Sequence, residues 1–83
     1  MNCKNMIYEI LHQIVNNIES IDDFSDLYDE FKLSSLDVVE IIVRIEESFG
    51  IEIDDYDLDL DNFRTVNSMV LLVERRLDKS NEF

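Results

Sequence analysis

The first hydrophobic residues of the chain recur at the spacing of an amphipathic helix. They follow one another at steps of three and one: Ile7, Ile10, Leu11, Ile14, Val15 and Ile18. This period predicts a helix over residues 5–19 with one buried face. The period is lost over residues 20–32, where aromatic residues are scattered among acidic ones, and we expect a long loop anchored by its aromatic side chains.

Residues 35–49 carry a second helical pattern, with apolar residues around much of the circumference and most charged residues on one narrow arc. A helix of this kind is expected at the centre of a bundle. Gly50 follows directly and predicts a left-handed cap. Glu46 projects into the apolar arc, so we expect it near the exposed end of the helix.

Residues 51–61 alternate apolar and acidic residues with a period of two, as a half-buried strand would. The sequence offers no second strand to pair with it, and an isolated strand leaves its backbone groups unpaired. A loop followed by a short irregular helix is therefore predicted, with a strand as the alternative.

Helical spacing returns near the end of the chain, where Thr65 is placed to cap a helix that continues to about Leu77. The patterns together predict an all-α fold. We expect a single domain over residues 1–83, a small helical bundle with three main helices and a short irregular helix before the last. Residues 1–4 and 79–83 are expected to fray.

The charge of the chain points to basic partners. Twenty acidic residues against seven basic ones give a formal net charge of −13. Proteins that bind nucleic acid do so through Lys and Arg on the phosphates, so no nucleic acid is expected as a partner. A strongly acidic domain instead attracts basic protein surfaces at long range.

Several kinds of chemistry are excluded by what the sequence lacks. One Cys, one His and one Gly cannot form an intramolecular disulfide, a Cys/His zinc site or a glycine-rich phosphate loop. The acidic run 54–62 begins like a calcium loop, but Leu60 and Val66 stand where glycine and glutamate are required, so no metal site is predicted. No apolar run is long enough for a membrane span, and we expect a cytoplasmic protein.

Two serines at the start of the central helix are the most informative residues. Ser34, with Asp37 three positions later, matches a capping box. Ser35 then lies in the first helical turn, where its hydroxyl is free and the positive end of the helix dipole favours a phosphate group. The alternative is that both serines only cap the helix.

The segment 31–53, with Ser34-Ser35-Leu36-Asp37 at the start of an acidic helix, resembles the acyl carrier protein family. The similarity extends over most of the chain. Two features depart from the family: Ser34 stands where most members have aspartate, and no glycine occurs in the three residues before it. The resemblance implies that Ser35 is the attachment residue for phosphopantetheine, which comes from coenzyme A and carries an acyl or related group as a thioester.

The resemblance also implies that the protein is a carrier and not an enzyme. Its partners would be a phosphopantetheinyl transferase and acyl-loading and acyl-using enzymes with basic docking surfaces, which a monomer would visit in turn. Fatty acid, polyketide, peptide and aminoacyl pathways all stay open. Partner recognition would fall on Leu36, Asp37, Glu40, Glu46, Glu47 and Ile53.

Two further expectations concern the interior and the alternative function. The interior of the bundle, which in some carriers shelters the acyl chain but is here expected to be an ordinary packed core, would be lined by Val39, Ile42, Val43, Leu58, Phe63, Val66, Met69 and Val70. The alternative function is an acidic interaction module that is never modified, or a nucleic-acid mimic that occupies a basic protein surface. In that case the acidic residues only solvate the helix or meet such a surface.

Overall fold

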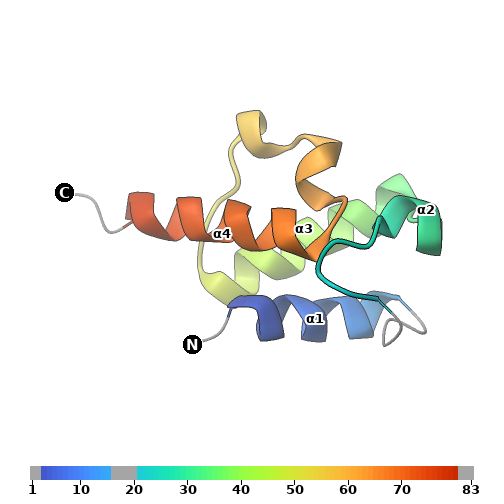
Figure 1. The fold of residues 1–83 in the computed structure, drawn as a ribbon. Coiled ribbons are helices and arrows are strands. Elements are labelled where there is room, and N and C mark those ends of the chain that lie inside the picture. Colours follow the sequence, from blue (N-terminus) through green and yellow to red (C-terminus); the bar gives the residue numbers. More distant parts are fainter. Residues whose placement is uncertain (1–2, 16–20, 81–83) are drawn as a thin grey trace.

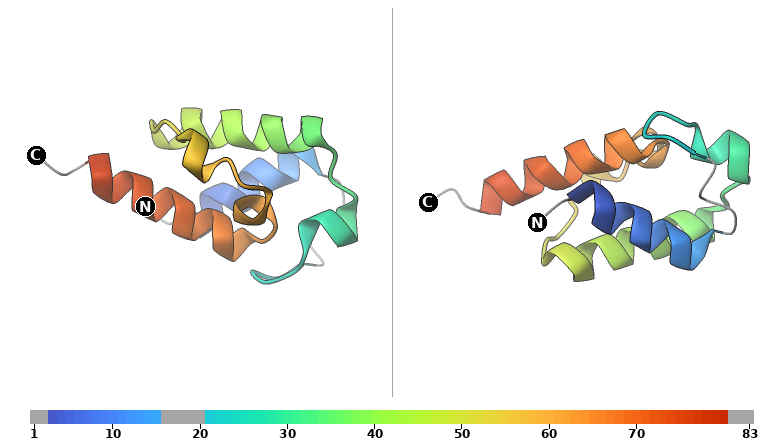
Figure 2. Two further views of the ribbon diagram at one scale, coloured as in Figure 1. Left: turned by 90° about the horizontal axis from the view of Figure 1, so that it is seen from above. Right: turned by 60° about the horizontal axis from the view of Figure 1, so that its bottom comes forward.

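Three long helices form the bundle in the computed structural model, which describes residues 3–15 and 21–80 (Figure 1). α1 packs against both α3 and α4, and Figure 2 shows the segment before α4 lying between α3 and α4. Within the described residues, no helix is both long and apolar enough to cross a membrane. The elements in chain order are α1 (Cys3–Ile14), α2 (Leu27–Phe31), α3 (Ser35–Phe49), the 3-10 helices η2 (Asp55–Asp57) and η3 (Leu60–Phe63), and α4 (Val66–Ser80).

The central helix confirms its prediction at both ends. α3 begins at Ser35 and ends at Phe49, as expected from the sequence. Gly50 follows with φ of 65° and donates its backbone N–H to the carbonyl of Glu46, which is the left-handed cap that was predicted. Local capping chemistry at both ends therefore defines the helix before any tertiary contact is considered.

The segment before α4 is helical and not a strand. The described residues 51–63 contain the 3-10 helices η2 and η3, so the strand alternative is wrong and the irregular helix is confirmed. The acidic residues of this run bind neighbouring groups. Asp59 accepts the backbone N–H of Asp61 at 2.9 Å, and Asp54 forms an ion pair with Arg76 of α4 at 2.8 Å. The acidic residues of this alternating segment thus act as helix caps and as ion-pair partners.

The ends of the outer helices differ from the prediction. Cys3 and Lys4 are helical because α1 begins at Cys3, and α4 continues to Ser80, whereas the fraying expected at these helix ends stays a prediction. α1 ends at Ile14, and the part of the predicted helix over residues 16–20 lies outside the described residues. The expected fraying of residues 1–2 and 81–83 lies outside them as well.

A short helix interrupts the predicted loop. α2 forms because the Asp26 side chain accepts the backbone N–H of Asp29 at 3.1 Å, which caps the helix, and because Leu27 is almost completely buried. Tyr28 and Phe31 are half-buried against the core, as expected of anchors. Phe24 is 73% exposed, so the prediction that the aromatic residues anchor this loop is wrong at that position.

The buried side of α3 is narrower than predicted. Its buried residues fall on one line of the helix, and an apolar residue one position further along points about 100° away from that line. Val39 is 54% exposed and Val43 is 44% exposed, so their placement in the interior is wrong, as is that of Leu58. The buried core consists of Ile7, Ile10, Leu11, Leu27, Val38, Ile41, Ile45, Phe49, Ile51, Phe63, Val66, Met69, Leu72 and Val73.

Candidate functional site

The start of α3 confirms the capping box predicted from the sequence. The Ser34 hydroxyl accepts the backbone N–H of Asp37 at 3.2 Å, and the Asp37 carboxylate accepts the backbone N–H of Ser34 at 3.0 Å. Ser35 is the first residue of the helix and is exposed. Among the described residues, no hydrogen bond occupies its hydroxyl. Its oxygen therefore stands at the positive end of a helix of 15 residues, accessible from solvent.

A groove of about 300 Å³ opens beside Ser35. It is formed by α2 and the start of α3, which are neighbours in the sequence, together with the distant segment from η3 to α4. Val38, which is nearly buried, connects the groove to the core below. The lining residues are Tyr28, Leu33, Ser34, Ser35, Val38, Leu60 and Arg64.

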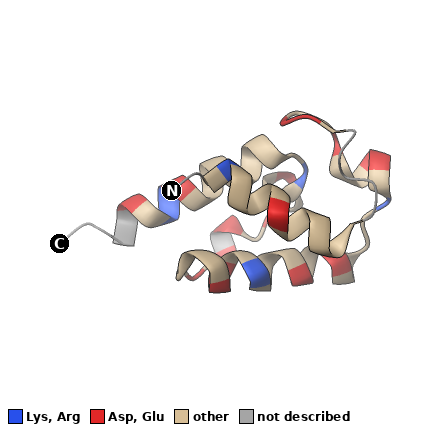
Figure 3. Cartoon of the chain, turned by 90° about the horizontal axis from the view of Figure 1, so that it is seen from below, with Lys and Arg blue, Asp and Glu red and all other residues tan. Residues whose placement is uncertain are grey.

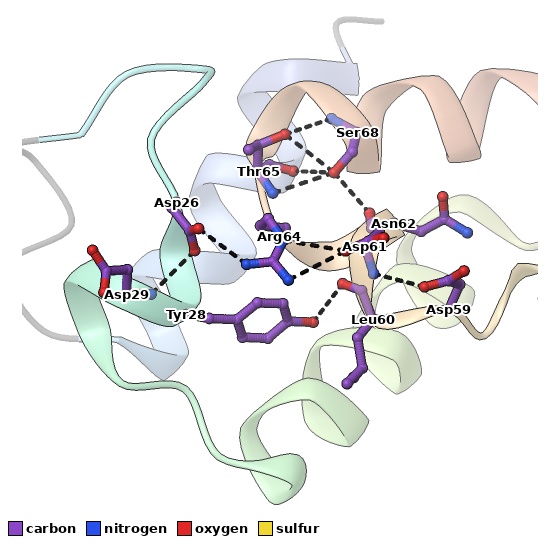
Figure 4. A network of polar contacts seen from close by, with 10 residues as sticks. All are labelled: Asp26, Tyr28, Asp29, Asp59, Leu60, Asp61, Asn62, Arg64, Thr65 and Ser68. Carbon is purple, nitrogen blue, oxygen red and sulfur yellow. Dashed lines mark hydrogen bonds and ion pairs between the residues drawn. The ribbon is translucent and has the colours of Figure 1, made fainter.

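Arg64 connects α2 and η3, which meet at this groove (Figure 4). Its guanidinium forms ion pairs with Asp26 at 3.0 Å and with Asp61 at 3.2 Å, and it lies 5.1 Å from the centroid of the Tyr28 ring. The Tyr28 hydroxyl donates to the backbone carbonyl of Leu60 at 2.7 Å. We call these five residues, Asp26, Tyr28, Leu60, Asp61 and Arg64, the Arg64 bracket. The bracket holds α2 against η3.

Backbone hydrogen bonds reinforce the bracket. The Leu27 N–H donates to the carbonyl of Arg64 at 2.8 Å, so α2 is tied to the entry of α4 independently of the side chains. Thr65 caps α4 as predicted, since its hydroxyl accepts the backbone N–H of Ser68 at 3.0 Å. The groove is thus built on elements that are anchored on each side.

The bracket also shifts the pKa values of its members. Hydrogen bonds to Asp26 and then to Asp61 raise the pKa of the Arg64 guanidinium, and burial raises the pKa of Tyr28. The backbone N–H of Asp29, followed by the guanidinium of Arg64, holds the pKa of the Asp26 carboxyl below its ordinary value. Asp26 is therefore ionised at neutral pH.

We expect replacement of Arg64 by glutamine to raise the pKa of Asp26 part of the way back towards its ordinary value, because the N–H of Asp29 remains. A carboxyl whose pKa is lowered by folding stabilises the fold above its unfolded pKa. That contribution is lost as the pH falls through the folded-state pKa. Carbon NMR titration of the Asp26 carboxyl in both proteins measures the effect. The same Asp26 pKa in wild type and Arg64→Gln would contradict the ion pair.

The acidic residues of α3 form more ion pairs and hydrogen bonds within the protein than the sequence suggests. Figure 3 shows acidic positions along α3 interrupted by one basic position. Glu40 forms the predicted ion pair with Arg44 at 3.2 Å, and Arg44 also donates to Gln13 of α1. Glu46 is half-buried, and its carboxylate accepts the backbone N–H of Ile53 at 2.9 Å. Glu46 therefore holds the chain after α3 in place, and Ile53 packs against the core.

The residues predicted for partner recognition fall into an exposed group and a group with contacts inside the protein. Leu36 is 81% exposed, and Glu40 and Glu47 are exposed, so these three form one accessible face with the start of α3. Asp37 is half-buried and belongs to the capping box. Asp37, Glu46 and Ile53 thus have structural contacts of their own.

Sequence reasoning missed two sets of residues. Val39 and Val43 continue the exposed line that begins at Leu36, and we define Leu36, Val39 and Val43 as the apolar stripe of α3. Their spacing of three and four residues on the side of the acidic arc was the available signal. Tyr28 and Arg64 of the groove had no such signal, because their proximity to Ser35 arises only from the tertiary fold.

No metal centre is found in the part of the chain that the structure describes. Over residues 3–15 and 21–80, no group of three or more His, Cys, Asp or Glu side chains is arranged to hold a metal ion. The acidic run after α3 instead binds arginines: Asp57 lies 3.6 Å from Arg75, and Asp54 and Asp61 have the partners given above.

Comparison with known proteins relates the whole helical region to one group. The family model for the phosphopantetheine attachment site matches residues 5–73. The acyl carrier protein of Buchnera aphidicola is 40% identical over 57 residues, which is 68% of this chain and 72% of that protein. The D-alanyl carrier protein of Lactococcus lactis is 27% identical over 78 residues, covering 93% of this chain and 99% of that protein.

Solved structures show the same fold. A chain in the crystal structure of an engineered glycine:[carrier protein] ligase from Bradyrhizobium japonicum, complexed with a carrier protein from Agrobacterium tumefaciens and ATP, matches with a TM-score of 0.82. It is 30% identical and covers 89% of this chain and 99% of that chain. The solution structure of a holo acyl carrier protein from Nitrosomonas europaea has a TM-score of 0.82 at 28% identity, covering 94% and 99%.

Proposed function

The chain belongs to the family of phosphopantetheine attachment domains, the acyl and D-alanyl carrier proteins, and from that premise we propose that Ser35 is the residue that carries the group. The protein is a carrier that bears phosphopantetheine, and it is a substrate of enzymes and not itself an enzyme. The family match favours this function over an unmodified acidic module or nucleic-acid mimic.

The exposure of Ser35 at the start of α3 is the observation that carries the proposal. Ser34 is occupied as the helix cap, whereas the Ser35 hydroxyl has no hydrogen-bond partner among the described residues. The first backbone N–H groups of a helix lack intrahelical acceptors, and with the dipole they favour a phosphodiester there by about 0.3–1 kcal/mol. The residues present therefore fit a covalently attached phosphate.

The chemistry required of the chain is limited to one nucleophile. The Ser35 oxygen would attack the phosphorus of coenzyme A that bears the pantetheine arm, and adenosine 3′,5′-bisphosphate would leave while the transferase takes the serine proton. When bound, the group supplies a terminal thiol that holds the cargo as a thioester. α3 fixes the position of Ser35, and the partner enzymes supply all other catalytic groups.

The proposal is tested by intact mass after incubation with coenzyme A, magnesium and a permissive phosphopantetheinyl transferase. We expect the wild-type protein to gain one phosphopantetheine. Circular dichroism of the same sample before the reaction shows whether the protein is folded, so unfolded protein is not mistaken for unreactive protein. A folded protein that gains no mass with several transferases would contradict the proposal.

We propose that partner enzymes dock on the apolar stripe of α3 and its acidic border. The apolar stripe is exposed and lies on the same helix as Ser35, and Glu40 and Glu47 flank it. Burial of exposed Leu and Val side chains supplies affinity, while a net charge of −13 speeds the encounter with a basic surface. Such steering weakens with salt.

We expect Leu36→Ser to lower kcat/KM for loading by about tenfold, since loss of one well-packed interface side chain costs on the order of 1–2 kcal/mol. Leu71→Ser is the matched control, because Leu71 is 50% exposed but lies on α4. Neither change should affect the melting temperature, as both side chains are exposed. Equal kcat/KM for the two variants would contradict docking on the apolar stripe.

The cargo is proposed as an acyl or aminoacyl group. The acyl carrier protein of Buchnera aphidicola and the D-alanyl carrier protein of Lactococcus lactis are both relatives of this chain. Protein purified from its own cells should show a mass increment that hydroxylamine removes, because hydroxylamine cleaves thioesters. The size of that increment distinguishes an aminoacyl group from a longer acyl chain, and mass beyond that of phosphopantetheine that resists hydroxylamine would contradict a thioester.

A further inference from the structure

The groove beside Ser35 differs in charge from the chain as a whole. The chain has a net charge of −13, yet among the described residues that line this groove Arg64 alone is charged. The other lining residues are apolar or neutral. The groove therefore suits a neutral occupant that presents apolar groups and hydrogen-bond acceptors, because the charge of Arg64 is offset by its ion pairs with Asp26 and Asp61.

The Arg64 bracket keeps the guanidinium in place beside the groove. Ion pairs to Asp26 and Asp61 and the Tyr28 ring fix its plane (Figure 4). A guanidinium has five N–H groups. Nε and one N–H on each terminal nitrogen are engaged by the two aspartates. The second N–H on each terminal nitrogen has no partner among the described residues, so Arg64 can still donate hydrogen bonds.

The group proposed for Ser35 matches this lining chemically. Pantetheine carries two methyl groups on one carbon, followed by a hydroxyl and amides whose carbonyl oxygens accept hydrogen bonds. Leu33, Val38 and Leu60 offer apolar contacts for the methyl groups, and Arg64 offers donors for the carbonyls. Attachment at Ser35, itself a lining residue, places the arm at the groove and removes most of the entropic cost of bringing the two together.

We propose that Arg64 is a positioning residue for the pantetheine arm, which lies in the groove between α2, η3 and the start of α3 and accepts hydrogen bonds from the guanidinium through an amide carbonyl. This inference rests on attachment at Ser35. The arm so held is fixed relative to the apolar stripe when a partner docks, and it leaves the groove when the partner's site takes the thiol.

The test uses the holo protein with a free thiol, loaded with isotope-labelled pantetheine. We expect nuclear Overhauser contacts from the pantetheine methyl protons to the Tyr28 ring and the Leu60 methyls, and arm amides that relax like folded backbone. Arg64→Gln should lose these contacts and give arm relaxation close to that of free pantetheine. In the apo form of Arg64→Gln, nuclear Overhauser contacts between Tyr28 and Leu60 check that α2 stays in place.

Leu60→Ala and Leu58→Ala form a matched pair that leaves the bracket intact. The bracket uses the backbone carbonyl of Leu60, so truncating that side chain alters the groove alone. Leu58 lies two residues earlier, is 46% exposed and is not a lining residue. We expect loss of the contacts between the arm and the Tyr28 ring in Leu60→Ala and retention of these contacts in Leu58→Ala.

The outcomes separate this inference from the proposed function. A protein that gains the phosphopantetheine mass but shows a freely moving arm overturns the inference and leaves attachment at Ser35 standing. Retention of the arm contacts in Arg64→Gln overturns the role of Arg64. A protein that does not gain the phosphopantetheine mass contradicts the proposed attachment at Ser35.

Discussion

Ser35→Ala is expected to abolish phosphopantetheine loading, whereas Ser34→Ala is expected to load and to unfold more easily. The two hydroxyls are adjacent but differ in their contacts. The Ser34 oxygen caps α3 by accepting the N–H of Asp37, and the Ser35 oxygen has no partner in the described chain. Removing a serine cap costs about 1 kcal/mol, while Ala in the first turn of a helix costs nothing comparable.

Intact mass and denaturant unfolding of both variants measure these effects. The mass of Ser35→Ala should stay that of the apo protein, with a free energy of unfolding equal to that of wild type. Ser34→Ala should gain the full mass and unfold at lower denaturant. Loss of loading in Ser34→Ala alone would contradict this account, because Ser34 would then be the attachment residue and Ser35 the cap.

Ile45→Asp is expected to remove most or all of the stability of the fold. Ile45 is completely buried on the inner line of α3, where an unpaired carboxylate costs about 3–5 kcal/mol. Small domains have total stabilities of about 5–15 kcal/mol, and an 83-residue domain lies towards the lower end. Thermal unfolding followed by circular dichroism should show no cooperative transition, or one lowered by many degrees.

Val43→Asp is the matched control on the same helix. The sequence alone places Val43 in the interior, where the same change would be as harmful, but the structure leaves it 44% exposed in the apolar stripe. We therefore expect a fold close in stability to wild type together with weaker docking of partner enzymes. A melting temperature lowered as far as that of Ile45→Asp would place Val43 in the core.

Elements defined by local chemistry could be predicted from the sequence. α3 is marked at its start by the capping box of Ser34 and Asp37 and at its end by Gly50, and each of these signals depends on neighbouring residues only. Ser35 follows from the same local pattern. α2 could not be predicted in this way, because its five residues carry little periodicity and it depends on burial of Leu27 and on a backbone bond to Arg64.

The candidate site is only partly visible in the sequence for the same reason. Ser35 and Leu36 lie in one motif, but Tyr28 and Arg64 reach the groove through the packing of α2 and η3. The sequence places Val39 and Val43 in the interior because a helix rich in Val and Ile gives a wide apolar arc, and only the neighbours of α3 decide which part of it is covered. Glu46 shows the converse, since its contact with Ile53 requires the chain to turn back after Gly50.

The central claim, that Ser35 carries phosphopantetheine, is tested most directly by locating the added mass within the loaded wild-type protein. Trypsin cleaves after Lys32 and Arg44 and releases residues 33–44, which contain both candidate serines. Fragmentation that retains the modification should place phosphopantetheine on Ser35 and leave Ser34 unmodified. Phosphopantetheine on Ser34, or on any residue outside this peptide, would contradict the claim.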